Sequence, residues 1–411
     1  MMKDNLPIIH VALPAKNEFG FIQHTLACLE KQSLQGFHTW ICVNQPDSYW
    51  ELPEKRNICQ NNQQTLELFK NYPGNNLHVL DKSSPGLGWQ GKNLGVGIAR
   101  KTIMDAIANN ASDTDIIVSL DADTVFGENY LETVLQRFAS NPQAVALANP
   151  YYHPLGNDST LNRAILRYEI YMRYYALNMR LTGSPYCFTP LGSSMAAPVW
   201  AYKKINGLTP KKSGEDFYFL QKLSKTGEIM MYNTQTVYPS ARLSDRVFFG
   251  TGPAMIKGIA GHWAAYPLFN PQFFQQVKET ISLFPELFTR PCPTPMDQFL
   301  QDQFRCDDIF EALRINHKSP HQFVKACHEK IDGLRILQFL KINQASVPNT
   351  DEDNLRDFLG NNFSVDSIQK ELETLNFSHS SVDNMNKIRN FLFETELKIQ
   401  KEHAKNISNP L

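Results

Sequence analysis

Two aspartates, Asp121 and Asp123, stand two residues apart at the end of the apolar run IIVSLDADTVF. Alternate residues of a strand point to the same face, so this spacing predicts that both carboxylates lie on one side of the sheet. Two such anions favour a hard cation, Mg²⁺ or Mn²⁺, held by one or two carboxylates with water and a substrate diphosphate at its other positions. A turn that ends the strand explains the same residues without a metal, because aspartate is common in turns. The carboxyl ends of parallel strands are where open α/β sheets bind ligands, which favours the metal site.

Glycines gather in residues 86–97, GLGWQGKNLGVG, between an expected strand and an expected helix. Lys92, beside exposed backbone N–H groups at the start of a helix, indicates contact with phosphate. Gly86, Gly88 and Gly91 match the pattern GxGxxG, but this loop does not follow the first strand of the sheet. A dinucleotide site is therefore a weak interpretation of the loop.

The same loop nearly matches the motif GxxxxGK[ST] of P-loop nucleoside triphosphatases (NTPases), with Asp121 as the second acid one βα unit later. Asn93 stands where that motif has the Ser or Thr hydroxyl that binds Mg²⁺, and an amide is a poor substitute for it. Glycines alone also permit a flexible connector. The P-loop and the plain connector both stay open beside a loop that contacts a diphosphate.

The run KKSGEDFYFLQKLSKTG predicts a helix with Ser213 as its N-cap, Asp216 at the capping-box position and Gly227 as its stop. Capping explains Asp216 without any catalysis. The alternative hypothesis is that Glu215 and Asp216, held ionised by the helix dipole, supply a general base. The two roles are compatible, and spacing alone favours the cap.

Two arginines, Arg242 and Arg246, lie in the stretch SARLSDRVFFGTG that comes after this helix. Their guanidinium groups are fork donors that can bind phosphate oxygens. A single arginine more commonly lies on the surface, where it is solvated or paired with an acidic side chain.

These residues need elements that hold them in place, and the first half of the chain alternates strand-like and helical runs. Such alternation is typical of βαβ units and predicts an α/β fold with a largely parallel sheet. The expected strands cover residues 8–13, 39–43, 77–80, 115–120, 144–148 and the strand-like segment 230–238, and the expected helices include residues 21–29, 93–109 and 159–181.

The composition and the hydrophobic pattern of the chain change near residue 265. Prolines cluster after this point, and amphipathic helices are expected from there to the end of the sequence. We expect one domain over residues 1–265 and a C-terminal helical domain over residues 266–411. The C-terminal helices carry no chemical motif. Completion of an acceptor site, formation of a homo-oligomer and docking of a partner all stay open for them.

The expected helix over residues 159–181 places tyrosines and methionines on one face and arginines broadly opposite. This pattern fits a wall that stacks on sugars, or a peripheral patch that contacts a membrane and a lipid-linked acceptor. Core packing, with the arginine stems lying along the surface, is the simpler explanation.

Composition narrows the classes of function. The 411 residues are 42% hydrophobic, which predicts a globular protein of roughly two domains. The net charge of −1 gives no electrostatic case for binding nucleic acid. Seven scattered cysteines without a CxxC pair disfavour a disulfide framework and a zinc ribbon. The sequence shows neither a secretory signal nor a bilayer-spanning apolar run, so we expect a cytoplasmic protein that is not integral to a membrane.

Four motifs occur in one order along the chain and together resemble family 2 glycosyltransferases of the GT-A fold, over about residues 6–255. They are ALPAKNE, GWQGKN, LDADT and GEDFYFLQKL, and the segment GSSMAAPVWAYKKINGL is similar to the stretch that lines the sugar and acceptor sites of the family. The second strand ends in Asn44 and Gln45, where the family has an acidic residue that binds the base, so uracil and guanine both stay open. The family's QxxRW is absent, and Arg246 lacks the tryptophan that would follow it.

The resemblance implies a role for each matching residue. Asp121 and Asp123 would bind the metal, and Asp216, with Glu215 beside it, would be the catalytic base. The residues implied in binding the nucleotide donor are Pro14, Asn17, Glu18, Asn44, Gly91, Lys92, Asn93, Asp121 and Arg246.

The resemblance also implies a bacterial-type hexosyltransferase of cell-envelope polysaccharide synthesis. It would move a sugar from a UDP- or GDP-sugar to a hydroxyl of a glycan or lipid-linked acceptor, using Mn²⁺ or Mg²⁺ and inverting the anomeric carbon. A processive synthase is not implied, because such enzymes carry transmembrane helices. An enzyme at the inner face of the membrane is compatible with this role. A P-loop-like NTPase and a catalytically silent nucleotide-sugar binding protein remain the alternatives.

Overall fold

The structure is a computed structural model, and it describes residues 7–70, 72, 76–91, 95–244, 250–345 and 348–408. The chain forms two compact units that alternate along the sequence. Unit 1 comprises Met1–Ile165, Pro190–Ala260 and Leu397–Leu411, and unit 2 comprises Leu166–Thr189 and Gly261–Glu396. The domain division expected at residue 265 stays a prediction.

Unit 1 is built on a seven-stranded sheet in the order β3-β2-β1-β4-β7-β6-β8. Neighbours β3, β2, β1 and β4 run parallel, β7 runs antiparallel to both β4 and β6, and β6 runs parallel to β8. The bounds are β1 (Ile9–Ala15), β2 (His38–Asn44), β3 (Leu77–Lys82), β4 (Ile116–Ser119), β6 (Ala146–Ala148), β7 (Met195–Pro198) and β8 (Ile229–Met230), with β5 (Val125–Phe126) and β9 (Val237–Tyr238) in a separate antiparallel pair.

The expected α/β class and the expected strands of the first half are confirmed, because continuous runs of apolar residues are buried on both faces of β1 and β4. The strand-like segment expected over residues 230–238 is instead two separate strands, β8 and β9, in different sheets. The sequence pattern also missed β7, whose four residues MAAP are buried but contain no β-branched side chain.

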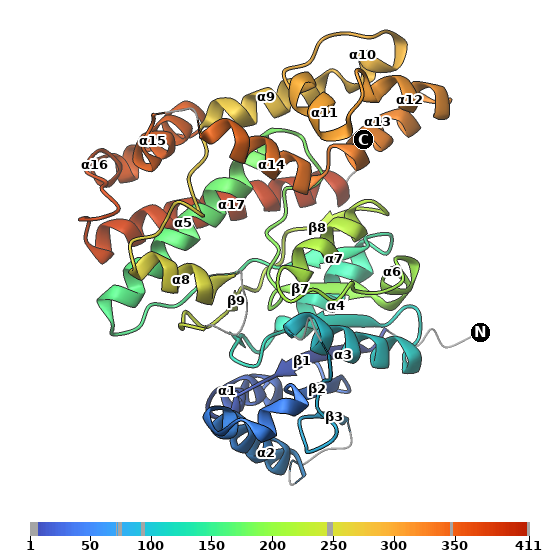
Figure 1. Ribbon diagram of the computed structural model, residues 1–411, viewed down its shortest axis with the longest axis vertical. Coiled ribbons are helices and arrows are strands. Elements are labelled where there is room, and N and C mark those ends of the chain that lie inside the picture. The colour runs from blue at the N-terminus through green and yellow to red at the C-terminus, as the bar shows by residue number, and fades with distance from the viewer. Residues whose placement is uncertain are drawn as a thin grey trace. The chain divides into compact units, whose positions relative to one another are not determined.

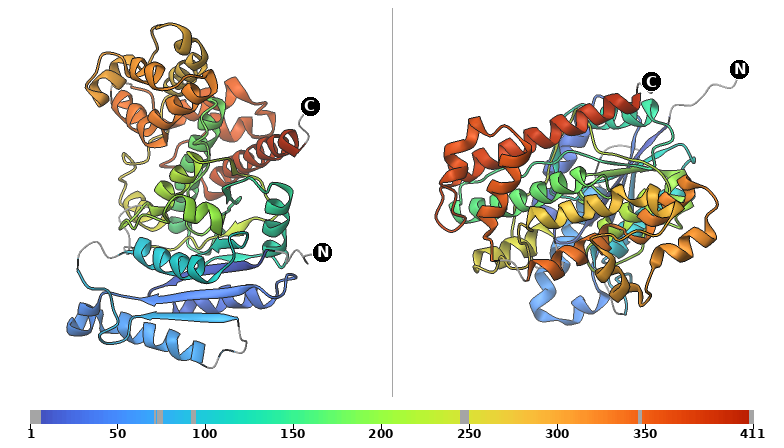
Figure 2. Two further views of the ribbon diagram at one scale, coloured as in Figure 1. Left: turned by 90° about the vertical axis from the view of Figure 1, so that its right-hand side faces the viewer. Right: turned by 90° about the horizontal axis from the view of Figure 1, so that it is seen from above.

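Helices cover the sheet of unit 1 on both sides. Connections between parallel strands are right-handed, and the chain moves from β1 through β2 to β3 in one direction and then returns past β1 to β4. The helices before and after this reversal therefore cover opposite faces, and Figure 2 shows β1 to β3 running between α2 and α3. The helices are α1 (Phe19–Glu30), α2 (Arg56–Lys70), α3 (Val96–Asn110), α4 (Tyr130–Ser140), α6 (Val199–Lys204), α7 (Glu215–Ser224) and α8 (Thr251–Ile259), with short 3₁₀ turns η1 (Asp47–Glu51) and η2 (Pro53–Lys55).

The reversal of strand order makes a switch point between β1 and β4, which are neighbours in the sheet; Figure 1 shows β1 beside β2 and β3 at the other side of this point. Loops at the carboxyl ends of strands diverge at such a point, and open α/β sheets bind their ligands in the crevice that results. The loop after β1 contains Glu18, and the loop after β4 contains Asp121 and Asp123. The topology thus brings three of the predicted site residues to one place.

Unit 2 is helical. Two long helices, α5 (Ser159–Leu181) and α17 (Val382–Ser408), each contribute a part of their length to it. The others are α9 (Pro271–Ser282), α10 (Phe284–Thr289), α11 (Asp297–Phe304), α12 (Ile309–Asn316), α13 (Pro320–Lys330), α14 (Gly333–Gln344), α15 (Asp351–Asn362), the 3₁₀ turn η3 (Asp366–Ile368) and α16 (Gln369–Glu373). Among helices in the described residues, none combines the length and apolar content that a bilayer span requires.

The arginines of α5 depart from the sequence prediction. Arg167 and Arg173 are buried, whereas surface positions were expected. Arg173 forms ion pairs with Glu169 at 2.7 Å and with Glu396 at 2.6 Å, and Arg167 pairs with Asp351. A buried charge needs such partners. Helix spacing allows the pair of Arg173 with Glu169, four residues earlier, but Glu396 and Asp351 are too distant in sequence for it to predict.

Candidate active site

The aspartate pair lies in a turn directly after β4. The strand ends at Ser119, and the backbone N–H of Thr124 donates to the carbonyl of Asp121 at 3.1 Å. Thr25 of α1 fixes the turn, because its buried hydroxyl lies 3.0 Å from the carbonyl of Ala122 and 2.9 Å from that of Thr124. The period-2 argument for the two carboxylates was therefore wrong in its premise: a strand no longer sets their directions once the chain has turned.

Each aspartate faces a different arginine. Asp121 Oδ1 lies 2.9 Å from Nη2 of Arg100, and Asp123 Oδ2 lies 2.7 Å from Nε of Arg242. The side chain of Asp121 is 40% exposed and that of Asp123 is 14% exposed. The turn therefore presents two anions, and the first reaches solvent.

Arg100, on α3, is the buried centre of a polar cluster. Only 1% of its surface is exposed. Its Nε lies 3.2 Å from Oε1 of Glu215, and its Nη1 donates to the carbonyl of Gly192 at 2.9 Å and to the hydroxyl of Ser119. Burial acts to lower the pKa of Arg100, but the carboxylates of Asp121 and Glu215 raise it further, so the guanidinium stays charged.

Gly192 links this cluster to Asp216. Its carbonyl accepts from Arg100, and its N–H donates to Oδ2 of Asp216 at 3.0 Å. A Cβ at position 192 would lie 2.3 Å from Nη2 of Arg100, so only glycine allows this close approach. The second oxygen of Asp216 accepts from the N–H of Phe217 at 2.8 Å. Two backbone donors thus hold the Asp216 carboxylate in one orientation.

The pKa of Asp216 is raised to about 7, first by burial and next by the neighbouring charge of Glu215, while Arg100 and the N–H of Phe217 act to lower it. The sequence-based hypothesis had the helix dipole hold this carboxylate ionised, which implies the opposite shift. Desolvation next to a second carboxylate outweighs the dipole at this position. The result is an acid that exchanges its proton near neutral pH.

The capping prediction for α7 was also wrong. The residue before the helix is Gly214, in the left-handed conformation with φ of 75°, and no side chain caps the helix. Asp216 lies in the first turn and bonds to Phe217 and Gly192, so it does not form the expected capping box with Ser213. A glycine that adopts positive φ starts the helix one residue later than the Ser-x-x-Asp pattern predicts.

Arg242 joins the loop after β1 to the loop after β4. It pairs with Glu18 Oε1 through Nη2 and with Asp123 through Nε, and its guanidinium carbon lies 4.2 Å from the centre of the Phe21 ring. Glu18 is only 4% exposed. Burial acts to lower the pKa of Arg242, and the two carboxylates raise it more, so Arg242 stays charged and pairs with both of them.

The donor set fits a divalent metal. Carboxylate oxygens are the ligands that Mg²⁺ and Mn²⁺ prefer, and Asp121 and Asp123 supply them at the switch point. Within the described part of the chain, no group of three His, Cys, Asp or Glu side chains is arranged to enclose a metal by itself.

The glycine loop is fastened to the end of β2. Gly86 N–H donates to the carboxylate of Asp47 at 2.9 Å, and Asp47 N–H donates to the carbonyl of Trp89 at 2.9 Å. A Cβ on Gly88 would lie 2.7 Å from the Asp47 backbone, so glycine is needed for this contact. The described part of the loop is therefore neither a free connector nor a loop whose first N–H is open to phosphate.

Other predicted nucleotide-binding residues lie at the ends of β1 and β2. Pro14 is buried within β1, and Asn17 is exposed with φ of 59°. Asn44 is buried, and its amide donates to the carbonyl of Ala15 at 2.9 Å, so it ties the two strand ends together. Gly91 is exposed with φ of 93°, while Lys92, Asn93 and Arg246 lie outside the described residues.

Sequence reasoning missed several residues that shape the site. Arg100 is in the middle of α3, where an arginine is usually solvated, so the pattern gave no signal for it. Thr25 of α1 and Asn62 of α2 support the two loops, the latter by accepting from the N–H of Asn17 at 2.8 Å. A polar residue on the apolar face of a predicted helix is the sequence pattern that would indicate such positions, because that face is expected to be buried.

Residues 89–195 match the family described as Glycosyl transferase family 2. This segment belongs to that family. The match includes Arg100, both aspartates of the turn and Gly192, and it ends at Met195 in β7. The resemblance drawn from the four sequence motifs is thereby confirmed, and with it the expectation of a glycosyltransferase. The expected fold class, a GT-A-type mostly parallel sheet with a C-terminal helical region, is confirmed as well.

Solved glycosyltransferase structures are similar in fold at low identity. Staphylococcus aureus TarS 1–349 in complex with UDP-GlcNAc is 13% identical, with 82% of this chain and 92% of that chain covered and a TM-score of 0.42. The mannosyltransferase PcManGT from Pyrobaculum calidifontis, in complex with GDP-Man and Mn²⁺, is 11% identical, with 96% and 88% covered and a TM-score of 0.39. Similarity at this level assigns no residue or ligand of the present chain. No curated protein matches the chain.

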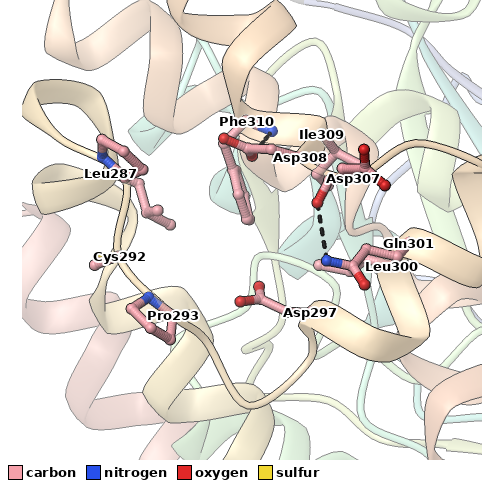
Figure 3. Close-up of a pocket in the computed structure, with 11 residues that line it drawn as sticks. Leu287, Cys292, Pro293, Asp297, Leu300, Gln301, Asp307, Asp308, Ile309 and Phe310 are labelled. Atoms are coloured by element: carbon pink, nitrogen blue, oxygen red, sulfur yellow. Dashed lines mark hydrogen bonds between the residues drawn. The ribbon is translucent and has the colours of Figure 1, made fainter.

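A cavity of about 290 Å³ lies in unit 2 and has a different character from the glycosyltransferase site (Figure 3). It lies between the segment around Pro293 and the starts of α11 and α12, and the carboxylates of Asp297 and Asp308 are engaged in local structure. Asp297 accepts from the N–H of Thr294 at 2.8 Å, and Asp308 caps α12 by accepting from the N–H of Phe310 at 2.7 Å. These acids stabilise turns and helix starts.

Proposed function

We propose that the chain transfers a sugar from a nucleotide-diphosphate sugar, a UDP- or GDP-sugar, to a hydroxyl of a glycan or lipid-linked acceptor. The observation that carries the proposal is that buried Arg100 pairs with both Asp121, after β4, and Glu215, while Gly192 bonds to Arg100 and to Asp216. Anionic groups at the carboxyl ends of β1 and β4 stand where this kind of sheet binds its ligand.

Asp121 and Asp123 would hold a divalent ion, Mn²⁺ or Mg²⁺. When bound, the ion supplies Lewis-acid neutralisation of the charge that develops on the leaving diphosphate. The role of this chain is to fix the two carboxylates, which Thr25 does through the turn carbonyls and Arg100 does through Asp121. Fixed carboxylates reduce the reorganisation that charge stabilisation requires.

Asp216 would accept the proton of the acceptor hydroxyl. A general base is most effective when its pKa is close to the working pH, and the raised pKa of about 7 meets that condition. The backbone N–H groups of Gly192 and Phe217 orient the carboxylate for this role. A single base of this kind, acting across from the leaving group, supports direct displacement and therefore inversion at the anomeric carbon.

The NTPase alternative is disfavoured by the Gly86 N–H. In a P-loop that group contributes to the phosphate cradle, whereas here it donates to Asp47. The catalytically silent binding protein differs from the proposed enzyme only in turnover, so it is an outcome of the test.

The test is a thermal-shift screen with UDP, GDP and ATP, each with and without Mn²⁺, followed by a donor-hydrolysis assay with the UDP- or GDP-sugars that stabilise the protein. We expect stabilisation by UDP or GDP that depends on Mn²⁺, slow hydrolysis of the matching sugar donor, and loss of both in Asp123→Ala. Stabilisation by ATP alone would contradict the proposal, and binding without hydrolysis or transfer would identify a silent binder.

A further inference from the structure

Arg242 occupies the place of a cation between two carboxylates. Glu18 comes from the loop after β1 and Asp123 from the turn after β4, and the guanidinium contacts one oxygen of each. Glu18 is buried, and the side chain of Asp123 is 14% exposed. Two carboxylates so poorly solvated require a positive partner, and Arg242 supplies one to both of them.

The same Asp123 carboxylate is the one that would bind the divalent ion of the proposed donor complex. Arg242 Nε lies 2.7 Å from its Oδ2. A divalent ion bound to this carboxylate would lie beside the guanidinium, and the two like charges repel strongly at such short range. Arg242 and the ion therefore compete for Asp123 Oδ2. Arg100 repels the ion as well, but it contacts only Oδ1 of Asp121, a carboxylate that is 40% exposed.

Arg242 can exchange partners, whereas the arginine on the other aspartate is fixed. Arg100 is almost completely buried and bonds to Asp121, Glu215, Ser119 and Gly192. The side chain of Arg242 is 21% exposed, and its backbone lies outside any helix or strand. A phosphate group that arrived with the metal would offer its guanidinium a new anionic partner of equal or better geometry.

We infer that Arg242, which bridges Glu18 and Asp123, competes with a divalent ion for Asp123, so that the ion binds weakly to the protein alone and tightly only with a nucleoside diphosphate, which binds the displaced guanidinium. The inference rests on the proposed function for the identity of the nucleotide, but its first half concerns the metal and the protein only. Coupling of this kind is reciprocal, so the metal raises nucleotide affinity by the same factor.

The experiment measures free Mn²⁺ by electron paramagnetic resonance during titration of MnCl₂ into the full chain, first alone and then with UDP or GDP. In the wild type we expect weak Mn²⁺ binding that tightens at least tenfold when the nucleotide is present. In Arg242→Gln we expect at least tenfold tighter Mn²⁺ binding without nucleotide and a smaller effect of the nucleotide. Arg242→Lys keeps the charge but loses the fork, so its affinity for Mn²⁺ alone falls between the two.

The matched control is Arg290→Gln, which removes an arginine that is exposed in unit 2 and pairs only within its own helix turn with Glu286. Its Mn²⁺ binding equals that of the wild type. Equal or weaker Mn²⁺ binding by Arg242→Gln would overturn the inference. If that variant does not fold, the wild type and Arg242→Lys decide: equal Mn²⁺ affinity with and without nucleotide overturns it.

Failure of the inference and failure of the proposed function are distinguishable. Tight Mn²⁺ binding by the wild type alone, with normal sugar transfer, would reject competition by Arg242 and leave the glycosyltransferase intact. Absence of transfer and of any nucleotide binding would reject the function, while the effect of Arg242→Gln on Mn²⁺ alone would still test the competition.

Discussion

Both units of the chain bury arginines among carboxylates, but the carboxylates of the two clusters differ in their exposure to solvent. In unit 2, Arg173 and Arg389 share Glu169, and Arg173 also pairs with Glu396. The acids and arginines of this cluster are almost fully buried, and they join α5 to α17. In unit 1, Arg100 is equally buried, yet its partner Asp121 is 40% exposed and the nearby Asp216 has a raised pKa.

Buried arginines therefore serve two different purposes in the two clusters. A closed cluster pairs its charges internally, so removal of one partner leaves a buried charge uncompensated, and the cluster offers nothing to a ligand. In an open cluster, a buried arginine orients carboxylates that still reach solvent, as a binding site requires. We therefore expect variants of the open cluster to change chemistry, with a pH-dependent effect on stability where the carboxylate titrates, and the variant of the closed cluster to change stability.

The largest effect is expected from Asp216→Asn. An amide cannot accept the acceptor's proton, so we predict that kcat falls by about 10² to 10⁴. The side chain keeps its size, but its amide offers one acceptor oxygen in place of two, so only one of the N–H groups of Gly192 and Phe217 keeps its acceptor. The affinity for UDP or GDP with Mn²⁺ should still change less than threefold, because Asp121 and Asp123 are unchanged. Steady-state transfer rates and calorimetric affinities measure the two quantities. Full turnover by this variant would remove Asp216 from the mechanism.

The matching variant in unit 2 is Glu169→Gln. It leaves Arg173 and Arg389 buried with one carboxylate fewer, so we predict a loss of about 3–5 kcal/mol in the free energy of unfolding of that unit. Urea unfolding followed by tryptophan fluorescence and circular dichroism measures the loss. The surface variant Arg290→Gln is the control, with an expected change within about 0.5 kcal/mol. A loss for Glu169→Gln no larger than that of the control would mean that the closed cluster does not stabilise the unit.

The smallest effect, and the most specific, is on pH dependence. The pKa of Asp216 rises from an ordinary 3.8 to about 7 on folding, so the folded state binds a proton more tightly than the unfolded state. The stabilising contribution of this group is therefore complete below pH 3.8 and is lost as the pH rises to about 7.

Two measurements follow from this sign. Transfer activity should rise with pH through about 7, because the base acts in its ionised form. The melting temperature of Asp216→Asn should exceed that of the wild type above pH 7, and the difference should shrink toward pH 4. A difference that is constant over this range would show that Asp216 does not carry the raised pKa.

Much of the fold could be predicted from the sequence because its signals are local. Apolar, β-branched runs predicted β1 to β4, and helical spacing predicted α1, α3 and α5. The position of Asp121 and Asp123 after a buried strand was sufficient to place them at the edge of the sheet. The short strand β7 carries no local signal, because its burial comes from its neighbours β4 and β6.

The parts of the site that could not be predicted depend on contacts between distant segments. Arg100 meets Glu215 across 115 positions of the sequence, and Arg242 meets Glu18 across 224. Helix spacing assigned arginines to the surface and Asp216 to a cap, because most of the contacts that bury them come from segments far away in the sequence. The raised pKa of Asp216 is likewise a property of the folded site, since it arises from burial next to Glu215.

The most direct test of the account is calorimetric titration of UDP- and GDP-sugars into the wild-type chain and into Asp121→Asn, with Mn²⁺ present. Asp121 pairs with the buried Arg100 and is itself 40% exposed, so its charge should be needed for binding of the sugar nucleotide but not for folding. We predict that the wild type binds at least one of the sugar nucleotides and that Asp121→Asn binds it at least tenfold more weakly. Equal affinity in the two proteins, or no binding of either sugar nucleotide to the wild type, would contradict the account.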